Sequence, residues 1–278
     1  MADRNAPGLR PDFATIGGLV LAFGGILGGL VLEGGHLHDV AQITAAFIVL
    51  GGTIGAVLVN TPKRTLIGAV KRLKDVFLEK PSGPATILEE ILGYAAKARK
   101  NGIVSLEDDA ESVKNPFLKK ALNLAIDGTD LQEIRAMMEI EMGIEEHQAE
   151  CEAKVFESAG GYAPTVGIIG AVMGLIQVMK HLENIDEVGR GIAVAFVATV
   201  YGVGLANLIL LPAASKIKAR AHEDATVREL MLEGVIGIVE GLNPKLIRSK
   251  LMPYVKHDTT LKANNRAEAP LKSAAVEN

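Results

Sequence analysis

Two long apolar segments dominate the second half of the chain, Tyr162 to Met179 and Gly191 to Leu211. A short polar stretch joins them, and neither segment contains Asp, Glu, Lys, Arg or His. Each segment is close to the roughly 20 residues that an α-helix needs to cross a hydrocarbon core of about 30 Å. Because a helix satisfies its own backbone hydrogen bonds, this pattern predicts a transmembrane helical hairpin.

Small residues recur at helical spacing along one side of each predicted helix. In lipid, such faces let helix backbones approach closely, and packing drives their association. Pro164 lies at the start of the first helix and Pro212 at the end of the second, so both should lie toward one side of the bilayer. The small residues are Ala163, Gly167, Gly170, Ala171 and Gly174 in the first helix, and Gly191, Ala195, Ala198, Gly202 and Ala206 in the second.

Two more apolar runs, at about 13–32 and 40–60, lie near the N-terminus and are separated by a short polar link. A cleaved signal peptide is the alternative interpretation of the first run. However, the run is longer than a typical signal-peptide core, and no small-residue cleavage site stands clear of its glycine repeats. We therefore expect a second membrane hairpin, and four spans in total.

Basic residues predict the orientation of these spans. They follow the second and fourth spans, whereas the link between the first two spans has no Lys or Arg. By the positive-inside rule, both termini and the long middle segment of this multi-pass protein are expected in the cytoplasm; the family resemblance described below implies the bacterial inner membrane. The basic residues are Lys63, Arg64, Lys71, Arg72 and Lys74 after the second span, and Lys216, Lys218 and Arg220 after the fourth.

The middle segment reads as amphipathic helices throughout. We expect a charged loop from Ser105 to Glu111, a capping box of Thr129 with Gln132, and a flexible junction at Gly160-Gly161. The predicted fold class is all-α, an integral membrane protein with four transmembrane helices and a helical cytoplasmic domain. The expected divisions are an N-terminal hairpin (1–60), a cytoplasmic domain (61–158), a second hairpin (159–213, spans about 162–181 and 190–211), C-terminal helices (214–256) and a disordered tail (257–278).

Composition narrows the class of protein further. The 278 residues are 49% hydrophobic yet 22% charged, as expected when membrane segments alternate with polar ones. The net charge of −4, with no basic stripe, gives no reason to expect a nucleic-acid partner. The single cysteine, Cys151, cannot form an intrachain disulfide. The pairs His36/His38 and His147/Cys151 lack further ligands, and no catalytic motif is present, so we expect no metal, no organic cofactor and no enzyme activity.

Several separated motifs resemble the MotA/PomA family, the stator subunits of the bacterial flagellar motor. They are KARKNGIVSLE (97–107), YAPTVGIIG (162–170), VATVYG (197–202) and GLNPKLI (241–247). The likeness covers nearly the whole chain except its two tails. The hairpin also resembles, more distantly, the ExbB/TolQ ion-channel proteins, but those have three spans and lack the N-terminal pair.

The resemblance implies five copies of the chain around two single-span MotB chains, forming a channel that turns ion flow into torque on the rotor protein FliG. An ion-driven channel usually needs an ionisable group inside the membrane, and these spans have none. The resemblance places that group, a carboxylate, on MotB, with Pro164, Ala171 and Thr199 along the ion pathway. It assigns torque coupling to Pro164 and Pro212, and rotor contact to Arg99 and Glu107. The alternatives are an ExbB/TolQ-like energiser of another envelope machine and a passive membrane scaffold.

The resemblance also bears on the coupling ion. Sodium-driven family members carry a threonine at the position of Ala171, and Thr199 is common to both kinds. Because sodium needs several oxygen ligands whereas a proton needs one carboxylate and a hydroxyl or water route, Ala171 favours protons. A sodium-driven stator is the alternative.

Overall fold

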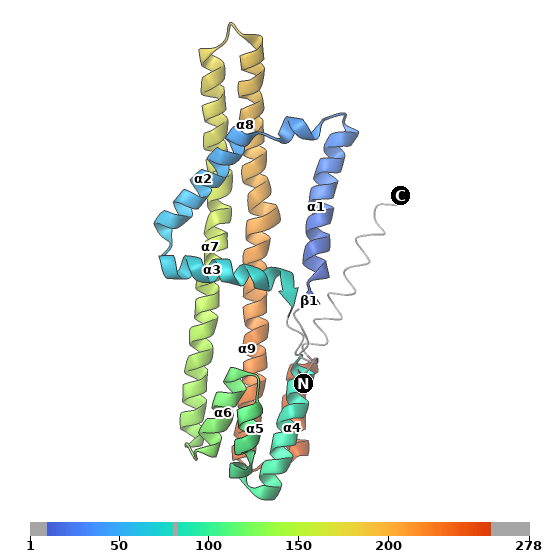
Figure 1. Cartoon of the computed structure of the whole chain (residues 1–278), viewed down its shortest axis with the longest axis vertical. Helices are drawn as coiled ribbons and strands as arrows, with labels where there is room; N and C mark the ends of the chain where they lie inside the picture. Colours follow the sequence, from blue (N-terminus) through green and yellow to red (C-terminus); the bar gives the residue numbers. More distant parts are fainter. Residues whose placement is uncertain (1–9, 80–82, 257–278) are drawn as a thin grey trace, which may run out of the picture. The chain divides into compact units, whose positions relative to one another are not determined.

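The computed structural model describes residues 10–79 and 83–256, which form two compact units. The membrane unit comprises residues 10–79 and 147–221, and the polar unit comprises residues 83–146 and 222–256. Helices α7 (Leu131–Lys180) and α9 (Leu211–Val239) contribute residues to both units (Figure 1). The tail predicted to be disordered, 257–278, lies outside the described residues.

Within the described residues, four helical segments are long and apolar enough to cross a membrane, which confirms the predicted all-helical class. Helix α1 (Phe13–Leu32) has the predicted bounds, and α2 (Ile43–Asn60) follows a 3₁₀ turn, η1 (Leu37–Val40). Helix α8 (Ile185–Leu205) begins before the expected Arg190 because the Asn184 side chain accepts the Asp186 N–H at 3.2 Å. An Asn at this position satisfies one of the free N–H groups of the first turn, so the helix starts there.

Helix α7 continues without a break through Gly160-Gly161, so the expected flexible junction there is wrong. A Cβ atom at Gly160 would lie 2.7 Å from Leu211 Cδ2. This glycine therefore allows a close approach of two helices within the membrane unit.

Pro212 does not end its helix. Helix α8 passes into a π-helical turn, η3 (Ala206–Leu210), and then directly into α9, in which Pro212 is the second residue. Because proline has no N–H, a carbonyl one turn earlier loses its hydrogen-bond partner. The wider π turn lies where that mismatch falls, and the helix continues beyond it.

Helix α3 (Lys63–Phe77) follows α2 closely and leads into β2 (Leu78–Glu79), which pairs antiparallel with β1 (Arg10–Pro11) just before α1. In Figure 1, α3 runs across the α7 and α9 helices, whereas α1 runs roughly parallel to α7 and α8. Leu66 and Ala69 of α3 pack with Ala159 of α7, and Val76 packs with Ala213 of α9. This arrangement brings the end of α2 and the start of α1 to the same level of the membrane unit.

At this level, the Asp12 side chain joins the start of α1 to α9. Its carboxylate caps α1 by accepting the N–H groups of Ala14 and Thr15, both at 3.1 Å. It also contacts Lys216 Nζ at 2.6 Å and Arg220 Nη2 at 2.8 Å, two side chains one turn apart on α9. Burial alone would raise the pKa of Asp12, but the hydrogen bonds from Lys216, Thr15 and Arg220 outweigh burial and lower this pKa to about 2.

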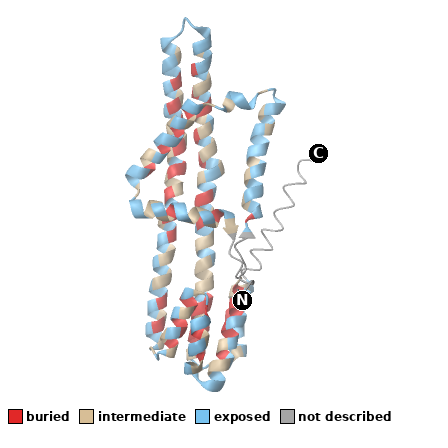
Figure 2. Cartoon of the chain, in the orientation of Figure 1, coloured by how far each residue is buried: buried red, intermediate tan, exposed pale blue. Residues whose placement is uncertain are grey.

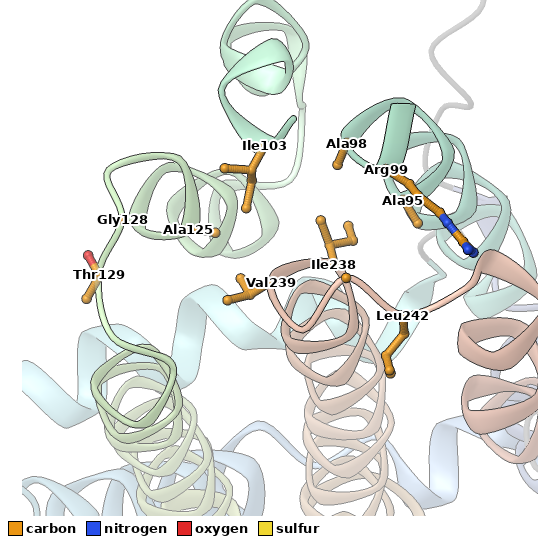
Figure 3. Close-up of a pocket in the computed structure, with 11 residues that line it drawn as sticks. Ala95, Ala98, Arg99, Ile103, Ala125, Gly128, Thr129, Ile238, Val239 and Leu242 are labelled. Atoms are coloured by element: carbon orange, nitrogen blue, oxygen red, sulfur yellow. The ribbon is translucent and has the colours of Figure 1, made fainter. Parts of the chain in front are cut away.

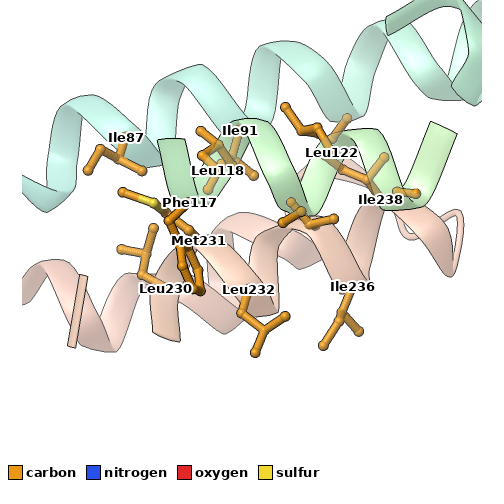
Figure 4. Packing of buried hydrophobic residues seen from close by; sticks show 14 of the residues in the cluster. Ile87, Ile91, Phe117, Leu118, Leu122, Leu230, Met231, Leu232, Ile236 and Ile238 are labelled. Atoms are coloured by element: carbon orange, nitrogen blue, oxygen red, sulfur yellow. The ribbon is translucent and has the colours of Figure 1, made fainter. Parts of the chain in front are cut away.

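The polar unit has its own apolar core (Figure 4). Helices α4 (Pro84–Asn101) and α6 (Pro116–Ile126) bury Ile91 and Leu118 against Leu230 and Ile236 of α9. A last helix covers residues 244–256. Buried positions therefore line the facing sides of these helices (Figure 2).

Two local expectations in the polar unit change. The stretch expected to be a charged loop is helical, as η2 (Ile103–Leu106) and α5 (Glu107–Ser112), with Leu106 and Ala110 buried. The start of α7 is capped by Asp130, which accepts the Gln132 N–H at 2.8 Å, and not by Thr129. Burial of the apolar residues explains the first change, because their contacts favour a helix where the charges suggested a loop.

We expect Asp12→Asn to lower the free energy of unfolding by about 2 kcal/mol at neutral pH, the value of a carboxylate pKa lowered by nearly two units. Asn keeps the helix cap but loses the charge that pairs with Lys216 and Arg220. Because the folded-state pKa is lowered, this contribution is complete above about pH 4 and is lost as the pH falls toward about 2. Thermal unfolding in detergent should therefore give a lower melting temperature for Asp12→Asn than for the wild type at neutral pH. The two melting temperatures should converge in acid. A constant difference down to the lowest pH would contradict this assignment.

Candidate functional site

The α7 and α8 helices meet along a seam at which backbone lies against backbone. A Cβ at Gly202 would lie 2.5 Å from the Ala163 carbonyl oxygen, and one at Gly167 would lie 2.8 Å from that of Ala198. One at Gly174 would lie 2.8 Å from the Gly191 carbonyl oxygen. These glycines therefore pack against the other helix of the same chain, as is typical of closely packed membrane helices.

Helix α2 packs on the same seam from outside. A Cβ at Gly52 would lie 2.6 Å from Val166 Cγ1, and one at Gly170 would lie 3.3 Å from Ile48 Cγ2. The Tyr201 hydroxyl donates to the Val40 carbonyl and accepts the Gln42 N–H at 3.3 Å. The packing of α2 against the hairpin thus rests on small residues plus one half-buried polar anchor, Tyr201.

The predicted ion-pathway residues lie at or beside this seam. Thr199 is half-buried, and its hydroxyl donates to the Ala195 carbonyl at 3.2 Å, one turn back on α8. A Cβ at Gly167 would lie 3.5 Å from Thr199 Cα, and the half-buried Ala171 follows one turn later on α7. The structure therefore brings Thr199 close to the Gly167 and Ala171 side of α7. Pro164 lies one turn from Gly167 at the other end and is also half-buried.

Much of the rest of the hairpin surface is apolar and exposed. Ile168 and Phe196 are 57% and 72% exposed, and Figure 2 shows mostly exposed positions toward the hairpin tip. Helix α1 has no buried residue at all. Apolar area of this extent, on helices that fit a membrane, is available for lipid and for other protein chains.

The two prolines lie close in level along the hairpin. Gly160 of α7 meets Leu211, and Pro164 follows Gly160 by one turn while Pro212 follows Leu211 directly. Pro164 deprives the Gly160 carbonyl of its helical partner, and the π turn precedes Pro212. Both helices therefore lack backbone hydrogen bonds at nearly the same level, at the Pro164 end of the predicted ion pathway.

In the polar unit, Arg99 and Glu107 are both exposed, in the last turn of α4 and at the start of α5. An ion pair of 2.6 Å between Lys97 and Asp109 ties these two helices together. Arg99 also lines a cavity of about 360 Å³ whose other walls include Ala98, Ile238 and Leu242 (Figure 3). The structure thus presents Arg99 and Glu107 on neighbouring helices, but only Arg99 lines the cavity.

One pair of potential metal ligands, His147 and Cys151, lies on α7. His147 Nε2 and Cys151 Sγ lie 3.6 Å apart on α7, with no third ligand group beside them. Across residues 10–79 and 83–256, no cluster of three or more His, Cys, Asp or Glu side chains could hold a metal ion.

The sequence analysis missed three polar contacts of the membrane unit. Asp12 and its two cationic partners form one, Tyr201 with Val40 forms the second, and the buried Glu152, which pairs with Arg72, forms the third. An Asp directly before an apolar run is a standard N-cap signal, so the role of Asp12 in starting α1 was detectable. Its partners are 204 and 208 residues away and carry no local signal.

Comparisons with known proteins agree with this geometry. Residues 109–230 match the MotA/TolQ/ExbB proton channel family, and residues 16–101 match the N-terminal region of motility protein A. Motility protein A of Bacillus subtilis is 36% identical over 93% of this chain and 96% of its own length.

Two solved structures have the same fold. The flagellar MotAB stator complex from Bacillus subtilis matches at 36% identity with a TM-score of 0.82, over 90% of this chain and 99% of that chain. The structure of C. jejuni MotAB matches at 33% identity with a TM-score of 0.85, over 89% and 97%. With a relative this similar over nearly the whole length, the chain belongs to the motility protein A family, within the MotA/TolQ/ExbB proton channel family.

Proposed function

We propose that this chain is a stator subunit of the bacterial flagellar motor, which forms a proton channel with a MotB-like single-span partner. Its relatives are named motility protein A, and the two solved structures are titled MotAB complexes. The chain is an inner-membrane, multi-pass protein, and we place both of its termini in the cytoplasm because basic residues follow the second and fourth spans.

One observation supports the two-chain channel most directly. The apolar parts of the hairpin, residues 162–179 and 191–211, carry no Asp, Glu, Lys, Arg or His, although the family is one of proton channels. Proton movement through a membrane protein needs a titratable group or a water route. The carboxylate must therefore come from the partner, and five copies of this chain around two partner chains is the arrangement that we propose.

Within this assembly, Ala171, Thr199 and Pro164 line the proton route toward the partner carboxylate. Thr199 is half-buried at this part of the seam, because a Cβ at Gly167 would lie 3.5 Å from its Cα, and its hydroxyl donates to the Ala195 carbonyl. Ala171 offers no oxygen ligand, which disfavours sodium. Pro164 and Pro212 couple ion passage to movement of α7 and α9, and Arg99 with Glu107 faces charged residues of the rotor protein FliG.

The coupling ion and the motor role can be tested in one strain that lacks this chain. We expect flagellar filaments to assemble but not to rotate, and re-expression of the chain to restore swimming. Swimming speed at fixed pH and membrane potential should not depend on external sodium, because in a proton-driven motor the membrane potential and the proton gradient, both held constant, supply all of the energy. A protonophore should stop swimming. Speed that rises and saturates with sodium would overturn proton coupling, and unassembled filaments would overturn the stator role.

Pro164→Ala restores an N–H group that can bond to the Gly160 carbonyl, so it should stiffen α7 at this level. We expect the complex to assemble normally and the motor to slow or stop. Pro116→Ala is the matched control, because Pro116 is the first residue of α6, where a new N–H gains no helical partner. Bead-rotation measurements with membrane quantification compare the two variants. Normal rotation of the Pro164→Ala motor would remove this residue from torque coupling.

Charge reversal at Arg99 should reduce torque by up to about five-fold, the factor that corresponds to about 1 kcal/mol for an exposed ion pair. A compensating charge reversal on the rotor protein should recover part of the torque. Lys114→Glu makes the same charge change at another exposed position of the polar unit and should rotate normally. Equal torque in the Arg99→Glu and Lys114→Glu motors would refute the rotor contact.

A further inference from the structure

Helix α3 is held at both ends by the membrane spans. Its first residue, Lys63, follows the last residue of α2, Asn60, by three positions. At its other end, the Phe77 carbonyl accepts the Asp12 N–H at 2.8 Å, directly before α1. The first and second spans therefore fix both ends of α3 at the same level, and its 15 residues, about 22 Å long, run across α7 and α9 (Figure 1). Because both ends adjoin ends of predicted membrane spans, we expect α3 to lie at the membrane boundary.

One side of α3 is committed to protein. Ala69 and Val76 are buried at 0% and 5% exposure against α7 and α9. On the neighbouring side, Arg72 pairs with the buried Glu152 of α7 and reaches Asp75 at 4.0 Å. These contacts determine which face of the helix remains free.

The free face has a distinct pattern. Lys63, Ile67, Val70 and Lys74 are spaced by four, three and four residues, so they form one stripe along the helix. Ile67 and Val70, in the middle, are 46% and 63% exposed, and the lysines at both ends are also exposed. Among the described residues, neither lysine has an ion-pair partner, and the same holds for Arg64 and Lys71 beside the stripe.

The charge of α3 is correspondingly one-sided. Between Lys63 and Phe77 the helix contains five basic residues and one acidic residue, and Arg72 is the basic residue that its neighbours neutralise. A helix that lies in a membrane interface, with exposed apolar residues and flanking cations, is attracted by anionic lipids as well as by the hydrophobic boundary.

We infer that the stripe Lys63, Ile67, Val70 and Lys74 is a binding site for anionic phospholipid headgroups. The two apolar side chains contact the glycerol and upper acyl region, and the two ammonium groups bind lipid phosphates about 16 Å apart along the helix. The site requires the four spans, but it does not depend on which ion is coupled or on contact with a rotor. It would anchor the level at which α1, α2 and α9 meet.

The test uses the purified complex with its MotB-like partner, in nanodiscs of phosphatidylcholine with a graded fraction of phosphatidylglycerol. We expect the wild-type complex to retain phosphatidylglycerol preferentially, measured by mass spectrometry of the bound lipids, and to melt at higher temperature as its fraction rises. Lys63→Gln with Lys74→Gln should reduce the preference about thirty-fold, the fold-change that corresponds to about 1 kcal/mol for each basic side chain.

Two matched variants make the result specific. Lys63→Arg with Lys74→Arg keeps both charges and should keep the lipid preference. Lys114→Gln with Lys245→Gln removes two exposed charges from the polar unit and should also keep it. Inorganic phosphate added to phosphatidylcholine discs should leave the melting temperature unchanged, which separates a lipid site from a general anion site.

Three results would overturn the inference. The first is equal phosphatidylglycerol retention by the wild type and by the Lys63→Gln, Lys74→Gln variant. The second is an equal loss in the polar-unit control. The third is a change in the number of copies per complex when Lys63 and Lys74 are replaced by Gln, with or without phosphatidylglycerol. The stripe would then be an interface between subunits.

Discussion

The membrane unit depends on backbone-to-backbone contact between α7 and α8. At Gly167, Gly174 and Gly202, even one methyl group would meet a carbonyl of the other helix at less than 3 Å. In a hydrocarbon environment, apolar side chains gain little by leaving lipid for one another, so shape at these positions determines the pairing. With the seam this tight, Thr199 can lie beside the Gly167 side of α7, and α2 can pack on both helices at once.

Two polar side chains of the membrane unit join segments that lie far apart in the sequence. Tyr201 fixes the start of α2, and Asp12 joins the start of α1 to Lys216 and Arg220 of α9. Between these two levels the hairpin offers weak points in its backbone, at Pro164 and at the π turn before Pro212. The unit is thus fixed at defined levels and deformable where the helical hydrogen bonds are incomplete, an arrangement suited to transmitting movement.

The spans were predictable because long runs without charge are a strong local signal, and α1 ends where its run ends. The local structure at Gly160-Gly161 and at Pro212, and the partners of Asp12, were not predictable. Gly160-Gly161 reads equally as a hinge or as a close contact, and only the position of Leu211 decides between them. Pro212 reads as a stop, but a π turn absorbs its missing N–H. The Asp12 cluster joins residues more than 200 positions apart, which no local pattern reveals. The roles of Ala171, Thr199, Arg99 and Glu107 came from family likeness and remain predictions.

The absence of Asp, Glu, Lys, Arg and His from the apolar parts of the hairpin also matters before assembly. A cell must synthesise and insert several copies of this chain, and a membrane segment that could relay protons by itself would dissipate the gradient during that time. Residues 162–179 and 191–211 contain only apolar and neutral polar groups. These segments of an isolated subunit therefore present an uncharged surface to the bilayer. Dividing the channel between two polypeptides therefore acts as a safeguard, in which permeability begins only when the second gene product arrives.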